Sequence, residues 1–169
     1  MGDLRSAAVP ELRDDDHVRG PAGAPLVILY GDFACPHCAL AHARLAGVSL
    51  RLAFRHFALR ARHPRAQALA HAAEAVALQD AFWPFHDALY EDPGRLADPH
   101  LWQRVADLGL DVERFDADRR SDAVAQRVAR DVREAMRAGI VTTPTLVVGD
   151  VLHPGPPAPE LLAALGRSG

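Results

Sequence analysis

Two cysteines three residues apart are the residues of this sequence best suited to chemistry. Cys35 and Cys38 enclose Pro36 and His37, and the chain has no other cysteine. A thiolate can act as a nucleophile or as a metal ligand, and a C-x-x-C pair in a reducing compartment is more often redox-active or metal-binding than structural. The motif therefore indicates thiol–disulfide exchange, with zinc binding as the competing chemistry.

Zinc binding is the weaker of these two interpretations. A structural zinc ion needs four protein ligands. His42 lies one helical turn beyond Cys38 and could join the pair, but no second pair of ligands stands at the usual spacing. We therefore expect no metal, and no dissociable cofactor, because disulfide exchange requires only sulfur atoms.

The flanking sequence predicts that the cysteines lie where a strand gives way to a helix. The apolar run Leu26–Tyr30 is typical of a strand, and residues 40–45 predict a short helix. Pro36 would occupy the first helical position, where its missing N–H costs nothing. The free N–H groups and the dipole of a first helical turn favour a thiolate at Cys35, as would a cationic His37.

Periodicity predicts the remaining elements. Alternation at period two predicts a strand over 50–56, and two short strands over 145–148 and 151–153 are joined by a Gly149-Asp150 turn. Helical spacing predicts a block of helices between these strands and one helix after them. The expected helices cover residues 66–80, continue over 82–90 after a kink at Pro84, and cover 98–108 and 121–138, with a last helix from Pro159.

Apolar side chains at helical spacing predict which positions of this block are buried. Asp98 is expected to cap the third helix with Pro99 at its first position, and Ser121 is expected to start the fourth. The expected inward positions are Leu101, Trp102, Val105 and Leu108 in the third helix and Val124, Val128, Val132 and Met136 in the fourth.

Charge and composition exclude several functions. The net charge is −3, and because the chain has no lysine all 19 basic residues are arginine. This charge predicts neither nucleic-acid binding nor a polybasic membrane contact, and Schiff-base lysines are excluded. The acidic run Asp14–Asp16 is expected to be solvated. Residues 1–18 lack an apolar signal segment, so we expect a cytoplasmic protein if Met1 is the native start.

The order of the elements predicts an α/β fold with the layout of thioredoxin. A strand–helix–strand unit is followed by helices and then by strand–strand–helix, and the first two strands should pair in parallel through a right-handed crossover. The expected divisions are an N-terminal arm over 1–24, an N-terminal half with the cysteines over 25–60, an inserted helical subdomain over 61–139 and a C-terminal half over 140–169.

Two motifs together resemble the DsbA-like thiol–disulfide oxidoreductases of the thioredoxin superfamily. They are Cys35-Pro36-His37-Cys38 and Thr143-Pro144-Thr145, the second at the head of a late strand. Further stretches resemble the branch that includes the modules found after some bacterial sodium/proton antiporters and their free-standing relatives. These stretches are residues 16–21, 30–33, 54–57, 72–75, 82–83 and 86–87.

The resemblance implies a role for each motif residue. Cys35 would be the exposed nucleophile that forms a mixed disulfide, and Cys38 the buried thiol that resolves it. Pro144 would be cis, so that the backbone at Thr143 lies against the sulfurs and binds the partner peptide. Most relatives carry an acid six residues before the first cysteine, where this chain has Leu29. Resolution by Cys38 would then be slower, or would use a water or His37.

The roles of the nearby polar residues stay open or structural at this point. Asp32 either tunes the cysteine pair or caps the turn before it. The aromatic residues between 82 and 90 are expected to pack the helical block. Four further histidines are expected to be structural or solvated rather than catalytic, namely His56, His63, His71 and His86.

The sequence thus predicts a thiol–disulfide oxidoreductase acting on protein or small-molecule thiols and disulfides. Its redox partner would be glutathione or a thioredoxin-type reductase, and the direction of electron flow stays open. Two other functions compete with this one. The first is a redox-inert regulatory or binding module with the same fold, and the second is a glutathione-dependent isomerase or transferase.

Overall fold

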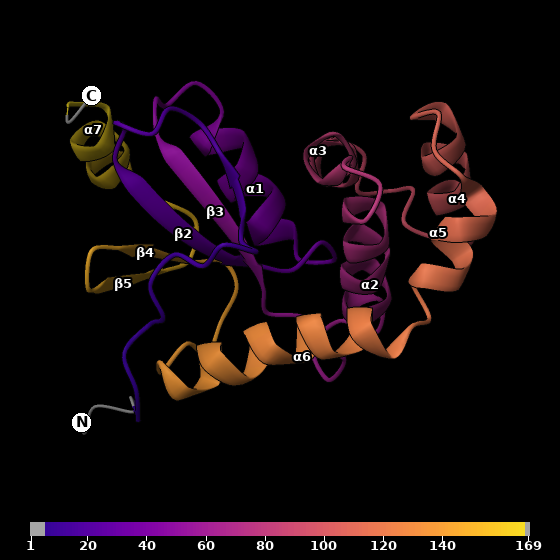
Figure 1. The fold of residues 1–169 in the computed structure, drawn as a ribbon. Coiled ribbons are helices and arrows are strands. Elements are labelled where there is room, and N and C mark those ends of the chain that lie inside the picture. The colour runs from indigo at the N-terminus through magenta and orange to yellow at the C-terminus, as the bar shows by residue number, and fades with distance from the viewer. Residues whose placement is uncertain (1–5, 168–169) are drawn as a thin grey trace.

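A five-stranded sheet with helices on both sides forms one half of the protein, and a block of helices forms the other (Figure 1). The computed structural model describes residues 6–167. The strands lie in the order β1-β3-β2-β4-β5. Their bounds are β1 His17–Arg19, β2 Leu26–Gly31, β3 Arg51–His56, β4 Thr145–Val148 and β5 Val151–Pro154.

The central pair β2 and β3 is parallel, as predicted, with Leu29 opposite Phe54. Helix α1, Pro36–Leu45, connects the two strands. β1 pairs antiparallel with β3, and β4 pairs antiparallel with both β2 and β5. Cys35 is therefore held at the end of a central strand, where α1 begins.

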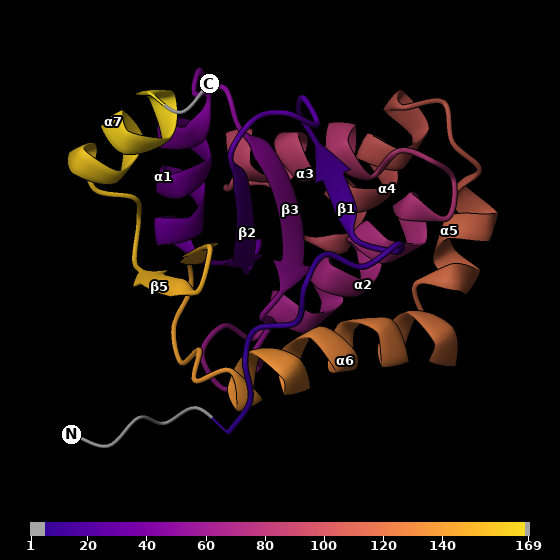
Figure 2. The ribbon, with the colours of Figure 1, turned by 60° about the vertical axis from the view of Figure 1, so that its left-hand side comes forward.

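Six further helices lie within residues 6–167, and five of them fall in sequence between β3 and β4. Figure 2 shows α1 and α7 near one end of the sheet, and α6 running from the helical block back toward the sheet. The bounds are α2 Ala66–Ala77, α3 Phe82–Glu91, α4 Asp98–Asp107, α5 Val112–Asp118, α6 Asp122–Arg137 and α7 Pro159–Arg167. No helix among residues 6–167 is both long enough and apolar enough to cross a bilayer.

Both faces of the sheet are buried, and successive residues of a strand face two different cores. Leu29, Leu52 and Phe54 belong to the larger apolar cluster, which also contains Cys35 and Cys38. The residues between them, such as Ile28 and Ala53, belong to a second cluster that includes residues around the end of α6. The period-two pattern in the sequence therefore corresponds to two buried faces of the sheet rather than to one buried and one solvent-exposed face.

The predicted kink at Pro84 is wrong, because α2 and α3 are separate helices. The chain breaks before Phe82, where Asp80 adopts a φ of 58°. Pro84 then falls in the first turn of α3, where a missing N–H breaks no helical hydrogen bond. The expected cap of α4 is also displaced by one residue, since Ala97 is the N-cap and Asp98 is already helical.

Three of the expected core positions are exposed. Trp102, Leu108 and Met136 have exposed fractions of 40%, 37% and 57%, whereas Leu101 and Val128 are buried as predicted. Helix α4 packs against α3 and α5 at the edge of the molecule. Fewer of its apolar residues are therefore buried than the sequence predicts. Met136 lies in the last turn of α6 beside an apolar surface pocket, which leaves its side chain in contact with solvent.

The acidic run is only partly solvated, contrary to prediction. The Asp16 side chain is fully buried and pairs with the equally buried Arg55 of β3, with Oδ2 and Nη2 2.6 Å apart. Burial alone would raise the pKa of Asp16, but hydrogen bonds from Arg55 and Arg13 outweigh it and lower that pKa to about 2. This ion pair fixes the chain just before β1 onto the sheet.

Candidate redox site

The two cysteines lie at the N-terminus of α1, both as free thiols. Cys35 is the N-cap and Pro36 follows within the first turn, as predicted. The Cys38 main-chain N–H donates to the Cys35 carbonyl at 3.0 Å, which places Cys38 one turn further along. The two thiols therefore lie on the same side of α1.

The late Thr-Pro motif meets the cysteines in space. The Thr143–Pro144 peptide bond is cis. Cys35 Sγ lies 3.5 Å from the Thr143 carbonyl oxygen, across 108 residues of sequence. A pocket of about 470 Å³ opens here. Its lining consists of Cys35, Pro36, His37, Arg62, His63, Thr142 and Thr143.

Cys35 is less exposed than expected. Its exposed fraction is 5%, and that of Cys38 is 1%. The description of Cys35 as an exposed nucleophile is therefore wrong, because the Thr143 segment covers it. Of the two cysteines, only Cys35 lines the pocket. A partner must therefore enter the pocket in order to reach the Cys35 sulfur.

The environments of the two thiols separate their pKa values widely. A hydrogen bond from Cys38 is the largest cause that lowers the pKa of Cys35, to about 5, against the opposing effect of burial. Thr143 and the main-chain N–H groups of His37 and Cys38 lower it further. Burial raises the pKa of Cys38 far above its ordinary value. At neutral pH the site holds one thiolate at Cys35 and one thiol at Cys38.

Asp32 is a buried part of this site, which the sequence left undecided. Its exposed fraction is 3%. It caps the turn before the cysteines, since Oδ1 accepts from the Ala34 N–H at 2.8 Å. Its own main-chain N–H lies 3.4 Å from Cys38 Sγ. Asp32 therefore both caps the turn and contacts the cysteine pair.

His63 and Tyr90 also belong to the surroundings of the cysteines. His63 Nδ1 lies 2.6 Å from Asp32 Oδ2, so this histidine, which the sequence predicts to be structural or solvated, contacts a buried residue of the site. Burial raises the pKa of Tyr90, whose hydroxyl lies beside Gly31 and has no hydrogen-bond partner among the described residues. Sequence spacing carries no signal for either contact, because a loop and a distant helix supply them. Leu29 is buried in the same cluster as both cysteines and offers no proton acceptor.

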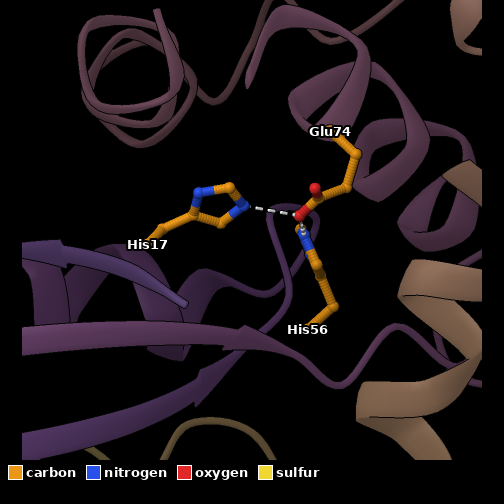
Figure 3. Close-up of side chains that lie close together, drawn as sticks. All are labelled: His17, His56 and Glu74. Carbon is orange, nitrogen blue, oxygen red and sulfur yellow. Dashed lines mark hydrogen bonds and ion pairs between the residues drawn. The ribbon is translucent and has the colours of Figure 1, made fainter. Parts of the chain in front are cut away.

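A second polar cluster joins the sheet to the helical block (Figure 3). Glu74 of α2 lies between His17 of β1 and His56 of β3, and Glu74 Oε1 is 2.7 Å from the Nε2 atom of each. The three residues have a composition that could hold a metal ion. Arg127 already lies 3.9 Å from the second Glu74 oxygen, so the carboxylate is neutralised by protein groups.

His42 groups with neither cysteine. One of its ring nitrogens lies within 4.8 Å of a ring nitrogen of His86 and a carboxylate oxygen of Asp87. These three residues form the other group among residues 6–167 whose composition could hold a metal. Arg19 occupies both Asp87 oxygens at 2.9 and 2.8 Å, so a cation already holds that carboxylate. The expectation that His42 could join the cysteines around zinc is not met by this arrangement.

Comparison with known proteins decides the family. A protein-family model described as Thioredoxin matches residues 13–165. The chain belongs to this thioredoxin family. The predicted resemblance and the α/β thioredoxin fold are thereby confirmed.

Solved structures and curated relatives agree with this assignment. The chain is similar to a thioredoxin-like oxidoreductase from Silicibacter pomeroyi, with a TM-score of 0.81, 25% identity and 92% of each chain covered. It also shares its fold with alpha-DsbA1 from Wolbachia pipientis, with a TM-score of 0.74, 22% identity and coverage of 93% and 94%. The Na(+)/H(+) antiporter NhaA 1 of Mycolicibacterium vanbaalenii is 40% identical over 162 residues, which are 90% of this chain and 26% of that protein. The chain thus spans about a quarter of the length of the curated relatives it matches.

Proposed function

We propose that this protein is a DsbA-like thiol–disulfide oxidoreductase that works through Cys35 and Cys38. The observation that carries the proposal is the difference in pKa and in access to the pocket between the two thiols. Cys35 is a thiolate with a pKa of about 5 at a pocket, whereas Cys38 is a buried thiol behind it. A thiolate attacks disulfides, and a low-pKa thiolate is also a good leaving group.

In the reducing direction, the Cys35 thiolate attacks one sulfur of a partner disulfide. A mixed disulfide forms, and the other partner sulfur leaves as a thiolate. Cys38 then loses its proton and attacks Cys35 Sγ, so that the Cys35–Cys38 disulfide forms and the second partner sulfur is released. The partner gains two electrons and the protein loses two. The oxidising direction runs through the same steps in reverse.

Thr143 and Pro144 are proposed to bind the partner. Thr143 lines the pocket and its carbonyl oxygen lies 3.5 Å from Cys35 Sγ, and Pro144 follows it through a cis peptide bond. An extended peptide beside this segment would be held by main-chain hydrogen bonds of the strand-addition kind, so binding would depend little on peptide sequence. His37, at the second helical position, is proposed to stabilise the Cys35 thiolate when its ring is cationic.

The test is the equilibrium reduction potential of the cysteine pair, measured in glutathione buffers by thiol alkylation. A value near that of thioredoxin, about −270 mV, would assign a reductase role, and a value near that of DsbA, about −120 mV, would assign an oxidant role. Either value supports the proposal. Failure to form a Cys35–Cys38 disulfide at any glutathione ratio would overturn it in favour of a redox-inert binding module.

Two variants separate the proposal from its other rival. A Cys38→Ser variant should accumulate a mixed disulfide with oxidised glutathione, and a Cys35→Ser variant should not. Sustained turnover of glutathione substrates by Cys38→Ser would instead indicate a glutathione-dependent isomerase or transferase. Glutathione or a thioredoxin-type reductase is the proposed redox partner. The cytoplasmic location stays a prediction, which fractionation of the source cells would check.

A further inference from the structure

The lining of the pocket at Cys35 is rich in side chains that can carry positive charge. Three of its residues have such side chains, namely His37, Arg62 and His63, and no lining residue is acidic. A histidine is cationic only when its ring is protonated, whereas a guanidinium keeps its charge at every physiological pH. The fixed positive charge of this pocket is therefore that of Arg62.

The Arg62 side chain is held at the pocket by a main-chain atom. Its Nη2 atom donates to the main-chain oxygen of Val141 at 3.0 Å. Val141 lies two residues before Thr143, so this bond holds the guanidinium beside the segment that contacts Cys35. Among residues 6–167, Arg62 has no acidic partner and no other side-chain hydrogen bond. The side chain is exposed, so its other N–H groups are free to bind a partner.

The buried carboxylate of Asp32 does not offset this charge. Its exposed fraction is 3%, and it does not line the pocket. One of its oxygens accepts from the Ala34 N–H, and the other lies 2.6 Å from His63 Nδ1. The negative charge that faces the pocket is the Cys35 thiolate, and this charge is lost when Cys35 enters a mixed disulfide. The charge of Arg62 then remains for a negative group on the partner.

The pocket has room for the residues around a reacting disulfide. Its volume is about 470 Å³, which is within the range of small-molecule sites. A guanidinium binds a carboxylate through two parallel hydrogen bonds, so the planar group selects this shape as well as this charge. Because Arg62 and Cys35 line the same pocket, one partner can place a sulfur at Cys35 and a nearby carboxylate at Arg62.

We propose that Arg62 determines which partners this site prefers, by binding a carboxylate that lies beside the reacting sulfur of the partner. The preferred substrates are then anionic thiols and disulfides. Main-chain contacts at Thr143 do not distinguish between side chains, so they do not supply this preference. The sulfur exchange runs through Cys35 and Cys38, and Arg62 takes up no proton and no electron. This inference rests on the proposed function and names the substrate class of the same site.

The decisive experiment compares two disulfides that differ by one carboxylate in each half. They are oxidised glutathione and the oxidised form of its glycine ethyl ester, in which that carboxylate is masked. Reduced protein is mixed with an excess of either disulfide, quenched with acid at intervals and analysed by mass spectrometry. The sum of mixed disulfide and internal disulfide counts every attack by Cys35. We expect the wild-type rate to be about 2- to 5-fold higher with the free carboxylate, and this ratio to fall in about 1 M salt.

Three variants show whether Arg62 causes the preference. Arg62→Gln should bring the ratio of the two rates to about one, and Arg62→Lys, which keeps the charge but not the planar group, should give a ratio between those of Arg62→Gln and wild type. Arg60→Gln is the matched control, because Arg60 is an exposed arginine that does not line the pocket. It should keep the wild-type ratio. A general change in the reactivity of Cys35 would alter both rates alike, so the ratio reports carboxylate binding.

A second pair of substrates distinguishes a small thiol from a polypeptide as the source of the carboxylate. Two peptide disulfides that carry either glutamate or glutamine next to the cysteine are compared in the same way. A preference confined to free glutathione would assign small anionic thiols as substrates. A preference for the glutamate peptide would assign acidic polypeptides. Either preference supports the inference if Arg62→Gln removes it.

The outcomes separate this inference from the proposed function. If Cys35 attacks none of the four disulfides, the oxidoreductase proposal fails and this inference fails with it. If Cys35 attacks them but the rates within each pair are equal in wild type, only the role of Arg62 is overturned. The same conclusion follows if Arg62→Gln keeps the wild-type ratios, or if Arg60→Gln lowers them equally. Should Arg62→Gln not fold, equal wild-type rates within both pairs would still overturn the inference.

Discussion

At the scale of single residues, one hydrogen bond between two thiols dominates the chemistry of the site. Cys38 donates toward Cys35, and this is the largest cause of the low Cys35 pKa of about 5. Cys38 can donate this hydrogen bond only while it remains a thiol. The Cys35 thiolate therefore has this support only while Cys38 keeps its proton. The pair therefore titrates as a unit, with the first proton leaving from Cys35.

Cys35 should react as a thiolate over most of the physiological pH range. In wild type, the rate of alkylation by iodoacetamide should rise with a midpoint near pH 5, because the pKa of Cys35 is about 5. In Cys38→Ala the largest lowering cause is gone, so the midpoint should move up toward that of a free thiol, about 8.5. An unchanged midpoint in Cys38→Ala would show that the helix and Thr143 control the thiolate instead.

At the scale of elements, caps and buried polar contacts set where helices start and what they pack against. Ser121 caps α6, and its hydroxyl accepts from the Val124 N–H. Glu74 of α2 binds one histidine from β1 and one from β3 (Figure 3). The first contact was predictable from sequence, whereas the second depends on how the helix lies on the sheet.

Loss of the α6 cap should cost measurable stability. Ser121→Ala leaves an N–H of the first turn without its acceptor, so we expect the free energy of unfolding to fall by about 1 kcal/mol. Urea denaturation would measure the change, provided that the dependence of the unfolding free energy on urea concentration is the same in both proteins. Ser49 is an exposed serine outside the helices, and Ser49→Ala should change the free energy by less than about 0.5 kcal/mol. Equal effects of the two substitutions would contradict the assigned cap.

The Glu74 cluster should make the protein sensitive to acid. Burial would raise the pKa of Glu74, but hydrogen bonds from His17 and His56 outweigh it and hold that pKa well below its ordinary value. A depressed folded pKa contributes stability above the unfolded value of about 4.3, and this contribution is lost as the pH falls below it. Glu74→Gln should therefore be less stable than wild type at pH 7, and the difference should shrink toward pH 3. Thermal unfolding across this range would check it.

At the scale of the whole molecule, arginine–carboxylate pairs connect segments that are distant in sequence. Arg13 binds Asp131 of α6 at 2.7 Å and also contacts Glu134. Arg55 binds Asp16 and the carbonyl of Pro10. These contacts fix the N-terminal segment against both β3 and α6. Residues 10–16 are therefore packed onto the fold, within the stretch that the sequence predicts to be an N-terminal arm.

Removal of one partner from the buried pair should destabilise the whole protein. Arg55→Met leaves Asp16 buried without its main cation, which should cost about 3–5 kcal/mol of unfolding free energy. Arg55→Met combined with Asp16→Asn should recover part of that loss, because no uncompensated charge remains. The folded Asp16 pKa is about 2, so its contribution is present above about pH 4 and is lost as the pH falls toward 2. Urea denaturation of wild type, Arg55→Met, Asp16→Asn and the double variant provides the double-mutant cycle. Strictly additive changes in unfolding free energy would contradict the coupling of Arg55 and Asp16.

The sequence by itself determined the family and the order of most of the elements. The strand before Cys35, Pro36 in the first turn of the helix and the late Thr143-Pro144 motif are local signals, and each depends on backbone chemistry within a few residues. Amphipathic periodicity also located α6, since its Ser121 cap and its valines lie within one helix. Such features form wherever the same short stretch occurs, so they can be read without knowledge of the remaining chain.

Only the tertiary structure decided the surroundings of the cysteines. Asp32 meets His63 across 31 residues, and Arg55 meets Asp16 across 39. Exposure of Met136 and burial of Cys35 likewise depend on which segments cover them. Contacts between distant residues are set by the packing of whole elements against each other, and no spacing in the sequence encodes that packing. Burial then fixes the charge state of each group, and so it decides which groups at this site hold protons.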